Sequence, residues 1–202
     1  MSEPAWRAIR SELLTMAEED GRVRAELAAD GALFGGYHPR MRAVHEANAE
    51  RLASILRARG WPGEPRVGPE GAKAAWIIVQ HAISRPAFQR EALEALRQAA
   101  TRGEVPAMQP ALLEDRIRTL EGRPQRYGTQ FDWDESGELR ALPLEDPEGL
   151  DERRSSVGLP PLADAARQHR AAAAMNGEGP PRDWTAYRRR LEQWLREVGW
   201  RE

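Results

Sequence analysis

The sequence predicts a mainly α-helical protein with one small β-hairpin and an amphipathic helix at its C-terminal end. Apolar residues recur at helical spacing along most of the chain, and proline and glycine stand where helices would begin and end. After residue 124 the pattern changes to the alternation of a strand. We therefore predict a compact helical domain at 1–174 with a hairpin at about 125–144, a linker at 175–182 and a docking helix at 183–202.

Five apolar stripes of helical period predict five helices before the hairpin. Pro39 and Pro86 stand near helix starts, where a missing backbone N–H costs least, and Gly60 and Gly103 stand where helices end. The apolar run at 74–79 would also suit a buried strand, but its length and its alanine-rich entry favour a helix. The predicted helices span about 4–29, 39–59, 69–83, 86–102 and 110–121.

The hairpin is predicted from alternating residues and a turn. Aromatic or β-branched side chains alternate with small or polar ones from 127 to 133, a turn follows at 135–137, and 139–144 can return as a second strand. A two-stranded ribbon is barely stable alone, so we expect it to pack on the helices. Short helices are expected from about 146 to 156 and after 161.

The C-terminal segment carries an apolar stripe at helical spacing over residues 184–198. A helix of this length is only marginally stable in water, so the stripe must dock on another surface. We expect it to dock on the main body of the same chain, and the alternatives are a second copy of the chain or another protein.

Composition excludes several classes of function. Lys and Arg number 30 against 32 Asp and Glu, so the net charge of -2 argues against a nucleic-acid binder. The absence of cysteine excludes disulfides and thiolate chemistry. No apolar run is long enough to cross a bilayer, and we expect a cytoplasmic protein. No phosphate loop, dinucleotide motif or pair of histidines at helical metal-ligand spacing occurs, so we expect no cofactor and no metal.

Four polar interruptions of apolar faces are the candidate functional positions, because a buried polar group needs a partner. Asn48 lies on the apolar stripe of the second helix, and Gln80-His81 ends the most hydrophobic segment. Asp115-Arg116 interrupts the fifth helix. Residues 125–130 add a polar run with Gly128, a position typical of a bulge or of close backbone approach to a ligand.

These positions suggest a site for acid–base chemistry. His81 is the candidate general acid or base, Asp115 its orienting or second acid–base group, and Arg116 an anion clamp. Each residue also has a structural interpretation: a core histidine bonded to a carbonyl, a buried ion pair, or a hydrogen-bonded strand. The remaining candidates would bind substrate, and they are Asn48, Gln80, Gln125, Tyr127, Thr129 and Gln130.

Several motifs also occur together in one order, at 45–48, 60–62, 67–68, 80–82, 88–89, 103–104, 115–116, 122–130 and 151–159. In order and spacing they resemble a bacterial family called domain of unknown function 6624, over about residues 10–165. The resemblance implies a mostly helical soluble domain whose polar motifs act together, and it implies no activity. Many members have Asp where this chain has Ile83; if that Asp orients the histidine, the difference weakens a catalytic role for His81.

Two functions are therefore compatible with the sequence. The first is an enzyme-like pocket between helices and hairpin, which performs hydrolysis or proton transfer on a small polar or anionic molecule. The second is a non-catalytic module, either a ligand sensor or an immunity-type protein, in which the same polar residues are structural. A homodimer or a protein partner could then use the helix at 184–198.

Overall fold

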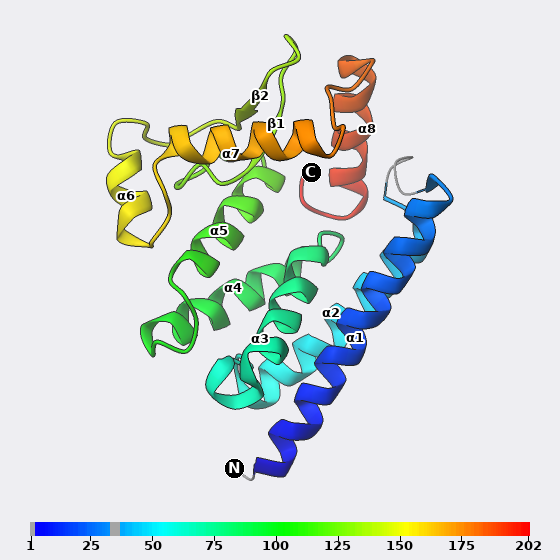
Figure 1. Cartoon of the computed structure of the whole chain (residues 1–202), viewed down its shortest axis with the longest axis vertical. Helices are drawn as coiled ribbons and strands as arrows, with labels where there is room; N and C mark the ends of the chain where they lie inside the picture. Colours follow the sequence, from blue (N-terminus) through cyan, green and yellow to red (C-terminus); the bar gives the residue numbers. More distant parts are fainter. Residues whose placement is uncertain (1–2, 33–36) are drawn as a thin grey trace. The chain divides into compact units, whose positions relative to one another are not determined.

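The computed structural model describes residues 3–32 and 37–202, and these form two compact units, residues 1–105 and 106–202 (Figure 1). The protein is mainly α-helical, with eight helices and one two-stranded hairpin in the described parts of the chain. The predicted fold class is confirmed. The division near residue 105 has no strong signal in the sequence, because helices flank it on both sides.

The N-terminal unit contains α1 (Glu3–Ala29), α2 (Pro39–Arg59), α3 (Glu64–His81) and α4 (Pro86–Thr101). Helix α1 packs against both α2 and α3, and α2 also packs against α4. The apolar stripes predicted from the sequence supply the core, in which Leu13, Leu52 and Leu96 are fully buried. His38 caps α2 by accepting a hydrogen bond from the backbone N–H of Arg40.

Helix α3 begins at Glu64, earlier than the predicted start at 69. The chain is kinked at Gly68, whose φ of 69° is in the left-handed region that favours glycine. Pro69, which lacks a backbone N–H, follows the kink, and the helix continues to His81. The sequence predicted only the part of α3 beyond the kink. The run at 74–79, which also suited a buried strand, is helical as expected.

The C-terminal unit contains helices and the hairpin. The elements are α5 (Met108–Leu120), β1 (Phe131–Trp133), β2 (Leu139–Ala141), α6 (Leu150–Ser156), α7 (Leu162–Met175) and α8 (Trp184–Glu197). The antiparallel strands pair Phe131 with Ala141 and Trp133 with Leu139. They are shorter than predicted, because the backbone N–H groups of residues 126, 127 and 129 donate to Asp115 on α5 instead of to a ladder. Helix α7 has 14 residues and is longer than expected.

Helix α8 packs on other elements of its own unit. Trp184 Nε1 donates a hydrogen bond to the carbonyl of Trp133 at 3.2 Å, and the Tyr187 hydroxyl donates to Asp132 at 3.0 Å. After the helix, Arg201 donates to two carbonyl groups at the end of α5. Figure 1 shows α8 in red beside the hairpin.

Among the helices of the described residues, none combines the length and the apolar character needed to cross a membrane.

Gly128 provides a test of the packing in the C-terminal unit. Its φ is +63°, and a Cβ atom there would lie 3.0 Å from Leu144 and 3.3 Å from Leu162. We expect Gly128→Ala to lower the free energy of unfolding by about 2–4 kcal/mol, from backbone strain plus overpacking. Urea denaturation would measure the loss.

Gly177→Ala is the matched control, because Gly177 has a φ of +66° and open space around its Cβ position. It should cost only the backbone strain of about 1–2 kcal/mol. Equal losses in the two variants would contradict the close contact at Gly128.

Candidate functional site

A buried carboxylate lies at the centre of the N-terminal unit. Asp20 stands on the apolar face of α1, seven residues after Leu13 and three before Val23, and only 2% of its surface is exposed. A carboxylate in such a position requires partners, because burial removes it from water. Two histidines supply them.

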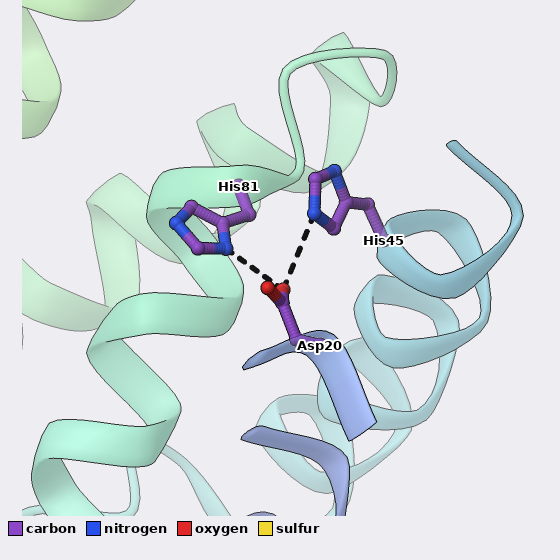
Figure 2. A group of neighbouring side chains, drawn as sticks. All are labelled: Asp20, His45 and His81. Atoms are coloured by element: carbon purple, nitrogen blue, oxygen red, sulfur yellow. Dashed lines mark hydrogen bonds and ion pairs between the residues drawn. The ribbon is translucent and has the colours of Figure 1, made fainter. Parts of the chain in front are cut away.

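Figure 2 shows His45 and His81 converging on Asp20 from two other helices. Nδ1 of His81 lies 2.7 Å from Oδ2 of Asp20, within hydrogen-bond distance. Nε2 of His45 lies 3.2 Å from the same oxygen. The centroids of the two imidazole rings are 5.0 Å apart. Helices α1, α2 and α3 thus each contribute one side chain to an Asp20–His45–His81 cluster.

The two histidines differ in exposure and in their second contacts. His81 is the last residue of α3, and its side chain is 32% exposed. His45 is buried within α2, and its Nδ1 lies 2.8 Å from the hydroxyl of Tyr37. Although Nε2 of His45 is near Asp20, it has no hydrogen-bond partner of acceptable geometry among the described residues. The exposed histidine can therefore meet a molecule from solution, whereas the buried one is held behind it.

The cluster keeps Asp20 ionised. Burial alone raises the pKa of Asp20, but the contacts from His45 and His81 lower it by more, so this pKa lies well below the usual range of a carboxyl group. An ionised carboxylate only accepts hydrogen bonds, so the proton between Asp20 and His81 is on Nδ1 of His81. In the neutral ring, Nε2 of His81 then carries the free lone pair.

The other predicted site residues of this unit lie close by in the sequence. Asn48, on α2, donates a hydrogen bond from Nδ2 to the carbonyl of Met16 at 3.2 Å, so it ties α2 to α1. Gln80 is half-buried and immediately precedes His81 on α3. Their predicted roles in substrate binding stay predictions.

Asp115 lies in the C-terminal unit, on α5, and is fully buried. Its carboxylate accepts hydrogen bonds from three backbone N–H groups, those of Arg126 at 2.7 Å, Tyr127 at 3.1 Å and Thr129 at 3.0 Å. Burial raises the pKa of Asp115, and the backbone hydrogen bonds only partly offset this rise. In its own unit Asp115 thus anchors a loop, and its predicted catalytic role stays a prediction.

The remaining predicted residues surround the same loop. Gln125 is fully buried; its Nε2 donates to the carbonyls of Gln130 and Leu142, and its Oε1 accepts from the N–H of Gln130 at 2.6 Å. Gln130 also donates to the hydroxyl of Thr129, and its Oε1 lies 3.5 Å from Nε of Arg116. Burial lowers the pKa of Arg116 to about 10. These contacts match the structural interpretation of the polar run.

Sequence reasoning missed three residues. Asp20 was detectable, because it interrupts the apolar stripe of α1 as Asn48 interrupts that of α2. His45 lies in the motif at 45–48 but was not among the candidate site residues, since nothing local links it to residue 81. Arg154, buried on α6, donates to the carbonyls of Tyr127 and Gly128, a long-range contact without a local signal.

Two cavities of the described chain lie within the C-terminal unit. The larger, of about 510 Å³, is lined by the hairpin and α7, and the smaller, of about 260 Å³, is lined by α5, α8 and the hairpin. None of the residues predicted from the sequence lines either cavity.

The sequence matches the family described as a family of unknown function (DUF6624), over residues 7–176. The chain belongs to this family. The DUF6624 match includes Asp20, His45 and His81 as well as the loop around Asp115, and it ends before α8. No curated protein and no solved structure matches the chain.

The family resemblance raised a question about Ile83, which stands where many members were expected to have Asp. In the structure, Asp20 on α1 supplies a carboxylate to His81. The absence of an acid at residue 83 therefore does not leave this histidine without one.

A conservative substitution tests the structural role of Asp115. In Asp115→Asn the amide nitrogen would face a backbone N–H that now donates to a carboxylate oxygen. We expect a loss of about 1–3 kcal/mol in the free energy of unfolding, because a buried donor loses its acceptor. Chemical denaturation would measure it.

Asp164→Asn, on α7 of the same unit, is the control. Asp164 pairs with Arg167 at the surface, so its loss should be below about 0.5 kcal/mol. If Asp115→Asn were equally harmless, the predicted catalytic role of Asp115 would gain support over the structural one.

Proposed function

We propose that the Asp20–His45–His81 cluster performs general acid–base chemistry on a small polar or anionic molecule, either hydrolysis or proton transfer. One observation carries the proposal: a buried carboxylate lies 2.7 Å from the Nδ1 of an imidazole whose side chain is about one-third exposed. Imidazole is the side chain best suited to exchange protons near neutral pH. His81 is thus the proton-transferring group.

Asp20 is the positioning residue in this proposal. By accepting the Nδ1 proton it selects the tautomer whose Nε2 can take a proton from a water or a substrate. Its negative charge then stabilises the imidazolium that results. Asp20 takes the orienting role for which the sequence suggested Asp115.

Hydrolysis by water suits the cluster better than covalent catalysis. Nucleophilic catalysis by a hydroxyl or thiol group needs a serine, threonine or cysteine beside the base. The chain has no cysteine, and no hydroxyl group is hydrogen-bonded to His81 among the contacts of the described residues. A water molecule activated by Nε2 of His81 is the nucleophile that we propose.

A second function is ligand sensing or protein binding without catalysis. It is favoured by the loop at 125–130, where polar side chains are occupied by hydrogen bonds within their own unit. The docking of α8 on the same chain removes one surface that such a module could have used for a partner.

Kinetics of His81→Gln test the proposal. The wild-type chain should hydrolyse p-nitrophenyl acetate or its anionic counterpart p-nitrophenyl phosphate. The substitution should lower the rate by about 10²-fold or more, since it removes the acid–base group. Because His81 is a partner of the buried Asp20 carboxylate, the free energy of unfolding should also fall, by about 1–3 kcal/mol, so the rates are compared under conditions in which both proteins are folded.

His169→Gln is the matched control, because His169 lies exposed on α7. It should leave the rate unchanged. The proposal is wrong if the wild-type chain hydrolyses neither ester, or if His81→Gln retains the wild-type rate.

A further inference from the structure

The three side chains of the cluster together offer a set of metal ligands. One nitrogen from each histidine and one oxygen from Asp20 lie within 4.8 Å of one another. Two imidazoles and one carboxylate suit zinc and other divalent transition metals, whereas magnesium and calcium prefer ligands that are all oxygen. The chemistry of the ligands therefore points to the zinc class of ions.

The distances are close to those around a single ion. Two atoms bound about 2.1 Å from the same metal stand roughly 3.0–3.4 Å apart at octahedral to tetrahedral angles. The Asp20 oxygen is 2.7 Å from the His81 nitrogen and 3.2 Å from the His45 nitrogen. The two nitrogens lie within 4.8 Å of each other, so a shift of roughly 1.5 Å or less would close the set around an ion.

His45 provides an independent observation. Its ring is more than nine-tenths buried, and Nε2, which faces the cluster, has no hydrogen-bond partner of acceptable geometry among the described residues. This nitrogen has only its contact with Asp20 at 3.2 Å, and a metal ion would take it as a ligand.

Tyr37 completes the surroundings of His45. Its hydroxyl lies 2.8 Å from Nδ1, the ring nitrogen that would not bind the metal. Metal-binding histidines usually donate the N–H of their second nitrogen to a neighbouring acceptor, which sets the tautomer and the ring orientation. In the metal-bound state the Tyr37 oxygen can accept that hydrogen bond, which leaves the lone pair on Nε2 of His45 for the metal.

We propose that Asp20, His45 and His81 bind one divalent transition-metal ion of the zinc class, with Tyr37 as the residue that orients His45. Three protein ligands leave a fourth position for water or another ligand. The ligands come from three helices, so no short-range spacing of histidines in the sequence indicates the site.

This metal site deepens the proposed function, and it rests on that function because the same three residues would carry out the chemistry. A metal of this class lowers the pKa of a bound water toward neutrality. In the loaded protein that water would exchange the proton, and His81 would hold the metal through Nδ1. In the metal-free protein Nε2 of His81 exchanges the proton.

Titration of the full chain tests the site. The protein, stripped with a chelator and dialysed, would be titrated with Zn²⁺ by calorimetry and with Co²⁺ by visible absorption. We expect one ion per chain, an absorption spectrum typical of low-coordinate cobalt, and much weaker binding of Mg²⁺. Failure of the wild-type chain to bind Zn²⁺ or Co²⁺ with a stoichiometry of one would overturn the inference.

Variants distinguish this site from adventitious binding. His45→Gln and His81→Gln should each weaken Zn²⁺ binding by about 100-fold or more, and Tyr37→Phe by about tenfold. His169→Gln, at an exposed histidine outside the cluster, should bind as the wild type does. Equal weakening by His169→Gln and His81→Gln would contradict the site, and His81→Gln keeps the test valid if a buried variant fails to fold.

The two proposals can fail separately. Stoichiometric Zn²⁺ binding without ester hydrolysis would support the metal site and contradict the proposed function. Hydrolysis that depends on His81 in chelator-treated protein, without metal binding, would support the function and contradict the metal site.

Discussion

The buried carboxylate of Asp20 is the interaction on which the N-terminal unit depends. Three helices enclose it, and an ionised group in that position would be strongly destabilising without partners. His45 from α2 and His81 from α3 meet this requirement by approaching the same oxygen. Both imidazoles are thus placed by their contacts with one charged group. One ring is buried and the other is partly exposed, so only His81 can contact a molecule from solution.

The C-terminal unit uses a buried carboxylate differently. Asp115 accepts hydrogen bonds from three backbone N–H groups and from the side chain of Thr129, none of which exchanges its proton near neutral pH. Gln125 and Arg154 donate hydrogen bonds to carbonyl groups of the same loop, residues 125–130. Both the N–H groups and the carbonyl groups of the loop therefore have side-chain partners. The partners of Asp20 are titratable rings that can also bind metals. In the proposed function, the identity of the partners, more than burial itself, distinguishes the role of Asp20 from that of Asp115.

The sequence predicted the helices well, because apolar periodicity and glycine or proline stops are local signals. It was less accurate where long-range contacts or a backbone kink decide the structure. The hairpin is short because its first residues donate hydrogen bonds to Asp115, and α3 starts early because Gly68 permits a kink. His81 was identified as a candidate from its place at the end of a hydrophobic segment. The sequence suggested Asp115 as its orienting or second acid–base group and did not indicate Asp20, since 61 residues separate Asp20 from His81 and only folding brings them together.

Membership in DUF6624 assigns the cluster no activity. The role proposed for Asp20 is therefore tested most directly by the protonation state of the histidines. The decisive measurement is the ring-nitrogen NMR spectrum of ¹⁵N-labelled, metal-free protein near neutral pH. The account predicts that His81 carries its proton on Nδ1, with Nε2 unprotonated in the neutral ring, and that Asp20→Asn removes this preference. A wild-type His81 with its proton on Nε2 and an unprotonated Nδ1 would contradict the claim that Asp20 orients this histidine.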